Sequence, residues 1–206
     1  MERPAPHTDS ICGSTDALHG KAVHHAANAS CTPPVTHVQH GFGPVWDAKS
    51  RLLILGSMPS PKSREASFYY MHPRNRFWPV MQALFSDPND PADVPGDAPA
   101  SRRAFALRHH VALWDVIASC DIVGASDASI RNATANDITP ILRGAPITRI
   151  YTTGGTAARL YCRLIAPQLE KADLTTPMIP LPSTSPANAS MGLQRLIDVY
   201  RNAFDG

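Results

Sequence analysis

Hydrophobic residues along the chain form short continuous runs and longer stretches in which apolar positions lie three and four residues apart. The short runs end in polar or glycine-containing turns and predict four strands, at 51–55, 111–117, 147–152 and 178–181. The wider spacing predicts helices over 77–85, 138–142, 157–165 and 193–200. Because strand and helix alternate, we expect an α/β fold, a three-layer α/β/α sandwich with a central four-stranded parallel sheet.

Two stretches refine this expectation. Pro180 lies within the last run, and a proline removes a backbone donor, so this strand should lie at an edge of the sheet. Residues 86–101 are rich in Asp, Pro and Ala and predict a surface loop.

The first 40 residues differ in composition from the remainder. They contain no Phe, Trp or Tyr, and they hold six of the nine histidines. Such a segment lacks the apolar surface that offsets the entropy of ordering, so we expect residues 1–40 to be a disordered tail without a part in the chemistry. Residues 41–206 should form a single domain. Its 17 basic and 14 acidic residues give a net charge of +3, which is compatible with nucleic acid but does not by itself indicate it.

The cysteines argue against a metal site. Cys12, Cys31, Cys120 and Cys162 are widely spaced and include no CxxC pair, so neither a zinc ribbon nor an iron–sulfur cluster is expected. The chain has no run of 18 apolar residues and no leader-like start, so we expect no membrane or secretory role. We therefore expect a cytoplasmic protein with reduced thiols and no cofactor.

In an open parallel sheet, ligands bind beyond the carboxyl ends of the strands. The candidate segments are therefore 56–76, 118–132, 152–156 and 182–190. The first is the most unusual, because three adjacent aromatic residues, Phe68 to Tyr70, precede a polar cluster that includes His72 and Asn75. These aromatics could form a lid over the core. Aromatic faces beside amide and guanidinium groups also suit a nucleobase and its phosphates.

Residues 56–78 resemble the first motif region of the uracil-DNA glycosylase superfamily, in which a strand ends in a G-x-x-P-G/S turn and an aromatic residue follows. The run HPRNRFW at 72–78 is similar to the HPxNRFW run of the mismatch-specific uracil/thymine DNA glycosylases. The sequence LPSTSPAN at 181–188 stands where the superfamily carries its second motif. Residues 42–204 as a whole look most like the hypoxanthine-DNA (deoxyinosine) glycosylase branch.

One position departs from the mismatch-specific pattern. The third residue of the first motif is there an Asn that positions water, whereas this chain has Met58, whose thioether has no donor and is a weak acceptor. The resemblance to the hypoxanthine branch implies that Asn75 takes over. The helix predicted nearby leaves a second interpretation open, in which Asn75 is its N-cap.

The resemblance also implies two sets of binding residues. Tyr70 would stack on the extruded base, unless it is a core aromatic. The expected base-binding set is Gly56, Ser57, Met58, Pro59, Tyr70, His72 and Phe77. The expected DNA-binding set is Ser60, Arg74, Ser183, Thr184, Ser185 and Asn188.

Several of these residues have an alternative structural role. His72 could fix its loop, and Arg74 and Arg76 could serve the fold instead of the DNA backbone. Ser185 with Pro186 could cap the last helix.

The favoured hypothesis is a monomeric base-excision glycosylase that acts on double- or single-stranded DNA containing deaminated bases, in the bacterial nucleoid. Hypoxanthine is the first candidate substrate, with uracil or xanthine next. The motifs place no lysine as a nucleophile, so the enzyme should leave abasic sites without cutting the strand. One alternative is a lesion-DNA-binding protein of the same fold with weak or no catalysis. A hydrolase of free nucleosides or esters is less favoured, because GxSxG is absent and no acidic pair is expected at the pocket mouth.

Overall fold

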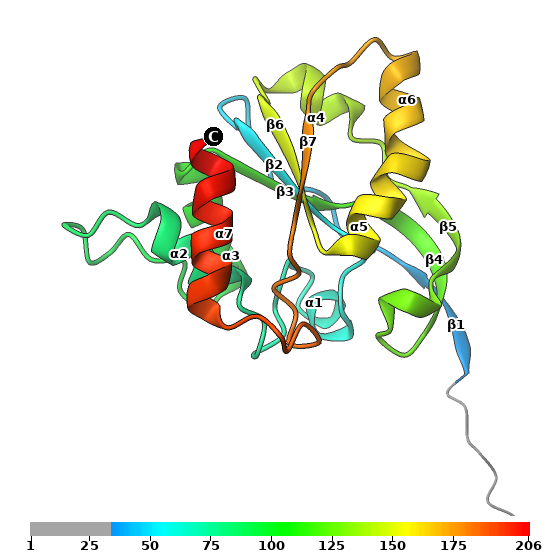
Figure 1. Ribbon diagram of the computed structural model, residues 1–206, viewed down its shortest axis with the longest axis horizontal. Helices are drawn as coiled ribbons and strands as arrows, with labels where there is room; N and C mark the ends of the chain where they lie inside the picture. Colours follow the sequence, from blue (N-terminus) through cyan, green and yellow to red (C-terminus); the bar gives the residue numbers. More distant parts are fainter. Residues whose placement is uncertain (1–33) are drawn as a thin grey trace, which may run out of the picture. The chain divides into compact units, whose positions relative to one another are not determined.

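A computed structural model describes residues 34–206, and Figure 1 shows the arrangement of their helices and strands. The strands are β1 (Val35–Gln39), β2 (Leu52–Gly56), β3 (Val111–Asp115), β4 (Ile117–Val123), β5 (Arg131–Ala135), β6 (Arg149–Thr153) and β7 (Met178–Leu181). The α-helices are α1 (Pro61–Glu65), α2 (Phe77–Phe85), α3 (Pro99–Arg108), α4 (Thr139–Gly144), α5 (Gly155–Leu160), α6 (Ala166–Lys171) and α7 (Leu193–Asp205). A 3-10 turn, η1 (Asp127–Ser129), joins β4 to β5, and a π-helical turn, η2 (Tyr161–Ile165), joins α5 to α6.

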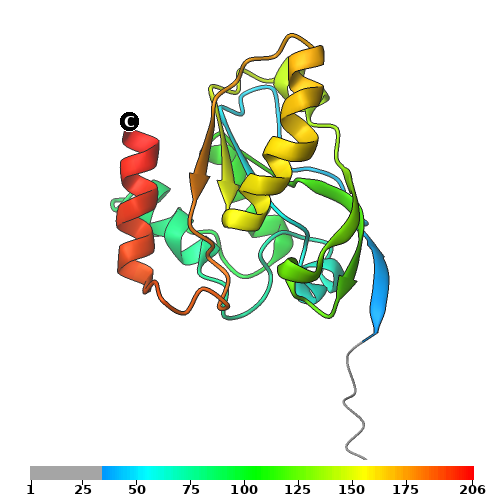
Figure 2. The same cartoon turned by 45° about the vertical axis from the view of Figure 1, so that its right-hand side comes forward.

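The central sheet has four parallel strands in the order β3-β2-β6-β7. Along β2, successive side chains point to opposite faces, so Ile54 packs with α2, α3 and α7 while Leu53 and Leu55 pack with the α5–α6 side. Figures 1 and 2 show these helices on the two sides of the sheet. The predicted α/β/α fold with a four-stranded parallel sheet is confirmed. The edge position predicted from Pro180 is also confirmed, because β7 ends the strand order and, among the strands of residues 34–206, pairs with β6 alone.

A second sheet was not predicted. It is antiparallel, with the order β1-β4-β5, and its inner residues Cys120 and Ile122 join the core on the α5–α6 side. The apolar run 111–117, predicted as one strand, divides at Val116: β3 ends in the parallel sheet and β4 starts in the antiparallel one. The Asn136 amide donates hydrogen bonds to the carbonyls of Asp115 (2.9 Å) and Ile117 (3.0 Å), and so stabilises this crossing.

The predicted boundary of the tail was also wrong. Strand β1 lies within the segment expected to be disordered, and it pairs with β4 along its whole length, from Val35–Val123 to Gln39–Ser119. His40, which follows this strand, is buried. Residues 1–33 of the predicted tail lie outside the described residues.

The loop predicted at 86–101 ends earlier than expected, because α3 begins at Pro99. A proline is favourable in the first turn of a helix, where its missing N–H would have no partner. Within residues 34–206, no helix has the length and apolar character needed to cross a membrane.

Candidate active site

A pocket of about 510 Å³ lies at the carboxyl ends of the parallel strands. All four segments predicted to surround a ligand contribute to it, with residues from 56–75, 122–128, 153–156 and 183–188. We call the side formed by residues 56–60, Tyr70 and Asn75 the motif wall. The two carboxyl groups that also line the pocket, Asp115 and Asp127, form what we call the carboxyl wall.

The motif wall begins with Gly56, where the neighbouring Asp115 leaves no room for a side chain. A β-carbon at Gly56 would collide with Oδ1 of Asp115, the residue paired with it on β3. The next residues, Ser57 and Met58, are buried and also line the pocket. Gly56 therefore allows the carboxyl wall to approach the end of β2.

Tyr70 lies over Phe77 in a parallel stack, with ring centroids 3.7 Å apart and an interplanar angle of 13°. The Phe77 ring is fully buried and does not line the pocket, so its predicted contact with the base is not what the structure shows; it supports Tyr70 from below. The Tyr70 hydroxyl forms a hydrogen bond with Oγ1 of Thr153, 3.3 Å away. Burial, with the nearby negative charge of Asp115, raises the pKa of Tyr70, so the phenol stays neutral.

The side chain of Asn75 lies between the start of α2 and the pocket. Its Oδ1 accepts a hydrogen bond at 2.9 Å from the backbone N–H of Phe77, the first residue of α2, so Asn75 supports the start of this helix from one position before the N-cap, Arg76. The same side chain lines the pocket, and among the described residues its Nδ2 has no hydrogen-bond partner. The amide N–H groups of Asn75 are therefore available to a ligand.

Arg76 serves the fold. Its guanidinium donates hydrogen bonds to the carbonyls of Thr184 (3.3 Å), Ser185 (2.6 Å), Asn188 (2.9 Å) and Met191. These contacts hold the second predicted motif against the start of α2. Arg74, by contrast, is exposed and lines no pocket, and among the described residues its side chain has no hydrogen-bond partner.

The second motif forms a loop whose polar groups largely bond to each other. Asn188 donates to the carbonyl of Ser183 at 2.8 Å, and Ser183 Oγ accepts from the Ser185 amide at 3.2 Å. The predicted helix cap at Ser185 is wrong, because α7 begins at Leu193 behind Gly192. Thr184 is almost fully buried, whereas the other three predicted DNA contacts of this loop, Ser183, Ser185 and Asn188, are partly exposed at the pocket.

Of the remaining predicted residues, Pro59 and Ser60 line the pocket and His72 does not. Ser60 caps α1 by accepting a bond from the Ser63 amide, and with Pro59 it lines the main pocket. His72 does not line that pocket. Its Nδ1 accepts a bond from the Arg74 amide at 3.1 Å, which fixes the loop.

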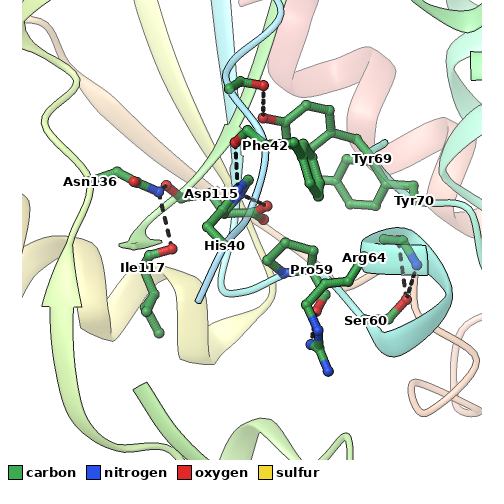
Figure 3. A network of polar contacts seen from close by, with 12 residues as sticks. His40, Phe42, Pro59, Ser60, Arg64, Tyr69, Tyr70, Asp115, Ile117 and Asn136 are labelled. Carbon is green, nitrogen blue, oxygen red and sulfur yellow. Dashed lines mark hydrogen bonds and ion pairs between the residues drawn. The ribbon is translucent and has the colours of Figure 1, made fainter. Parts of the chain in front are cut away.

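The carboxyl wall was not predicted. Asp115 is buried at the end of β3, and its Oδ2 lies 2.8 Å from Nε2 of His40 (Figure 3). Asp127, in the turn between β4 and β5, accepts a 2.5 Å hydrogen bond from the Ser57 hydroxyl. The expectation that no acidic pair lies at the pocket was wrong, because Asp115 ends β3 and Asp127 lies in η1, and only folding brings the two carboxyls to one pocket.

The surroundings of Asp127 change the pKa of its carboxyl. Asp127 is exposed as a residue, yet desolvation of its carboxyl group by the surrounding protein raises its pKa above the usual value. The Ser57 hydrogen bond opposes this shift, and the negative charge of Asp115 adds to it. Asp127 therefore holds a proton more readily than an ordinary aspartate.

Arg64 is a further pocket residue that the sequence did not single out. It lies on α1, and its Nη1 donates a 2.6 Å hydrogen bond to the carbonyl of Pro59 (Figure 3). A guanidinium has five donors, so most of this group remains available to an anion such as a phosphate.

Neither a metal nor a covalent amine is suggested by this part of the chain. Among residues 34–206, no three His, Cys, Asp or Glu side chains cluster as metal ligands. The described residues that line the pocket include no lysine. The available groups are an aromatic face, an amide, hydroxyls, carboxyls and one guanidinium, which together suit a flat polar ligand with an attached anion.

A parallel sheet with such a pocket at its carboxyl edge defines a ligand-binding α/β domain. Comparison with known proteins makes the assignment specific, since residues 43–203 match the uracil DNA glycosylase superfamily. The chain therefore belongs to that superfamily.

Two relatives are named hypoxanthine DNA glycosylase. The protein from Methanosarcina acetivorans is 29% identical over 160 residues, which cover 77% of this chain and 93% of the relative. The protein from Methanosarcina barkeri is 28% identical over 117 residues, 57% of this chain and 71% of the relative. The solution structure of a proposed uracil DNA glycosylase from M. acetivorans superposes with a TM-score of 0.61 at 26% identity, covering 81% of this chain and 98% of that one.

Proposed function

We propose that this protein is a monofunctional DNA glycosylase that removes deaminated bases, with hypoxanthine as its first substrate and uracil or xanthine as further ones. The observation that carries the proposal is the motif wall, where Tyr70 and Asn75 face one pocket at the carboxyl edge of the sheet. The names of the two Methanosarcina relatives support the choice of hypoxanthine.

The reaction requires the target nucleotide to leave the DNA stack and enter the pocket. Because one face of Tyr70 is covered by Phe77, its other face is available to stack on the base. Backbone amides near Ser57 and Met58 would stabilise the negative charge that the base acquires as the N-glycosidic bond breaks. Gly56 and Pro59 shape this turn, and His72 contributes by fixing the neighbouring loop.

Water attacks C1′ of the sugar as the electron pair of the bond moves to the departing nitrogen. Asn75 is the proposed catalytic residue: its free amide contacts the base or sugar, and its Oδ1 retains a second lone pair beside the bond from the Phe77 amide for water. Asp127 offers a carboxylate in the same pocket, held by Ser57. It could accept the proton that the water releases.

The DNA strand would enter between α1 and the second-motif loop. Arg64 and Ser60 lie at one side of the pocket, and Ser183, Ser185 and Asn188 at the other. The exposed guanidinium of Arg74 would contact a phosphate farther along the strand. Thr184 contributes through its backbone, because its carbonyl accepts bonds from Arg76.

We further propose that the enzyme acts as a monomer on cytoplasmic, nucleoid-associated DNA and leaves an abasic site. Strand cleavage by a glycosylase proceeds through an amine nucleophile, and no lysine is among the described residues that line the pocket. Residues 1–33 have no part in this proposal, which concerns a single domain from the start of β1 onward.

The test is incubation with duplexes and single strands that carry hypoxanthine, uracil or xanthine, followed by alkali. We expect strand breaks only after alkali, and fastest for hypoxanthine. Breaks without alkali would contradict monofunctional chemistry. An absence of product from every lesion would contradict the glycosylase itself.

A lesion-binding protein without turnover is the alternative, motivated by Met58 at the position where mismatch-specific relatives carry Asn. It predicts selective binding to lesion DNA, no product, and no effect of Asn75→Ala. Free deoxyinosine should be tested beside the DNA substrates, because Asp115 and Asp127 give the pocket the acidic pair that a nucleoside hydrolase would need. Release of hypoxanthine from the free nucleoside would favour that hydrolase.

A further inference from the structure

His40 and Asp115 form a buried pair behind the pocket. The histidine follows β1 and the aspartate ends β3, 75 positions later, and their side chains are each 5% exposed. His40 Nδ1 lies 2.8 Å from the carbonyl of Phe42, and its Nε2 lies 2.8 Å from Asp115 Oδ2 (Figure 3).

These contacts determine where the protons lie. A carbonyl oxygen can only accept, so Nδ1 of His40 carries a hydrogen. A second proton must lie between Nε2 and Oδ2, on one atom or the other, because two lone pairs facing each other at 2.8 Å would repel. The pair is therefore neutral as a whole, whichever heavy atom holds that proton.

The second carboxyl oxygen, Oδ1, is an acceptor in both arrangements. If Asp115 is ionised, Oδ1 shares the negative charge; if Oδ2 is protonated, Oδ1 is the carbonyl oxygen. Among the described residues no donor reaches Oδ1, and Asp115 lines the pocket beside the end of β2, where only a glycine leaves room for this oxygen. This oxygen keeps some exposure to the pocket, so a ligand that donates a hydrogen bond can reach it.

Deamination converts one ring nitrogen of the base from a hydrogen-bond acceptor into a donor, which an acceptor such as Asp115 Oδ1 would detect. Adenine N1 and cytosine N3 are acceptors, whereas the corresponding nitrogens of hypoxanthine and uracil carry a hydrogen. We propose that Asp115 Oδ1 accepts a hydrogen bond from this ring N–H and thereby distinguishes a deaminated base from its parent. The proposal rests on the glycosylase function and specifies how its pocket selects substrates.

Guanine and thymine also carry the corresponding ring N–H. The discrimination therefore applies to hypoxanthine against adenine and to uracil against cytosine. His40 is a positioning residue, since it does not contact the base but supplies the proton that keeps Oδ1 an acceptor.

The ligand-side test compares oligonucleotides containing hypoxanthine with others containing N1-methylhypoxanthine, in which a methyl group replaces the hydrogen. Excision is measured on ordinary sugars, and binding on sugars with a 2′-fluorine that slows the reaction. We expect the wild-type protein to prefer hypoxanthine by at least about tenfold in both measurements, as for loss of a hydrogen bond to a buried carboxyl. The parent base, adenine, should be rejected to a similar extent.

The second test measures, in variants of the protein, the same ratio of hypoxanthine to N1-methylhypoxanthine in excision and in binding. Asp115→Ala removes the acceptor and makes room for the methyl group, so the preference should fall to about one. Asp115→Asn should keep most of it, because a neutral His40 accepts from the Asn amide and leaves the carbonyl oxygen facing the pocket. His40→Ala removes that orientation and should lower the ratio, because hypoxanthine is bound less well while N1-methylhypoxanthine is bound as before.

A matched control is available between β1 and β4. His37 and Asp121 form a second pair at 2.8 Å, but it lies outside the pocket and is exposed by 58% and 26%. Asp121→Ala and His37→Ala should leave both excision and the ratio unchanged. Urea unfolding of every variant separates lost selectivity from lost folding.

Each outcome decides one claim. Excision of hypoxanthine and N1-methylhypoxanthine at equal rates would overturn the role of Asp115 and leave the glycosylase function standing. A wild-type preference that persists in Asp115→Ala would overturn it as well. If the protein neither excises a deaminated base nor binds hypoxanthine better than adenine, both proposals are wrong.

Discussion

The two walls of the pocket differ in how the chain builds them. The motif wall comes almost entirely from one segment, 56–75, in which a turn, an aromatic residue and an amide follow one another. The carboxyl wall needs three distant positions, His40, Asp115 and Asp127, which meet because β1, β4 and β5 form a second sheet beside the first. The motif wall can be recognised from sequence, whereas the carboxyl wall exists only in the folded chain.

The walls also differ in what stabilises them. Arg76 and Phe77 hold the motif wall from behind, by donating to carbonyls and by stacking. The carboxyl wall is held by hydrogen bonds, one between His40 and Asp115 and one from Ser57 to Asp127. Substitutions behind the motif wall should therefore affect stability, and those within either wall should affect the chemistry.

The largest expected effect is on the stability of the motif wall. Arg76→Met leaves four carbonyls of the second-motif loop without their donor. We expect the free energy of unfolding to fall by about 3 kcal/mol, since hydrogen bonds to charged groups are among the stronger ones. Urea unfolding measures this. Arg74→Met is the matched control two residues away, and a loss as large in that variant would contradict the assignment of Arg76.

The next effect is catalytic. Asn75→Ala should lower the single-turnover rate on a hypoxanthine duplex by at least about tenfold, as for the loss of a preorganised polar group. Asn75→Asp keeps an acceptor for the Phe77 amide and removes the free N–H groups, so it should retain stability and still lose rate. An unchanged rate in both variants would leave Asn75 as a support for the start of α2 alone.

A smaller effect is expected from the stacking ring. Tyr70→Ala should reduce excision about fivefold, in the range of a base–aromatic stack. Tyr70→Phe keeps the ring and loses only the contact with Thr153, so its rate should stay within about threefold of wild type. Equal losses in the two variants would show that the hydroxyl matters and the stack does not.

The smallest expected effect is on how folding stability depends on pH, and it concerns Asp127 in the carboxyl wall. Because the folded protein raises the pKa of Asp127, its ionisation destabilises the fold as pH rises from the ordinary aspartate value through the raised one. Asp127→Asn removes that penalty while its amide oxygen still accepts from Ser57. The variant should be more stable than wild type at neutral pH, and the difference should vanish in acid. A difference independent of pH would contradict the raised pKa.

The parallel sheet could be predicted because its strands are buried on both faces. Leu53, Ile54 and Leu55 are all fully buried, and such strands appear in the sequence as continuous apolar runs. The second sheet gives no such signal. Four of the five residues of β1 are exposed, and β5 has the sequence RNATA, so both strands are held mainly by backbone pairing with β4.

The same difference, between signals that are contiguous in sequence and contacts that only folding creates, explains which site residues could be predicted. Tyr70 and Asn75 could be proposed because their polar and aromatic neighbours are contiguous. His40 was assigned to the tail because the histidine-rich segment around it lacks aromatic residues, although its own side chain is buried. The short-range pattern also misled at Ser185, where a serine before a proline resembles a cap but forms a turn instead.

The most direct measurement is the release of free hypoxanthine from a duplex, followed by chromatography, for wild type, Asn75→Ala and Asp115→Ala at matched folded concentrations. If both walls act on one extruded base, wild type releases hypoxanthine and leaves an abasic site, while each variant stays folded and releases it at least about tenfold more slowly. The assignment of this pocket is contradicted if wild type releases none, or if both variants release hypoxanthine at the wild-type rate.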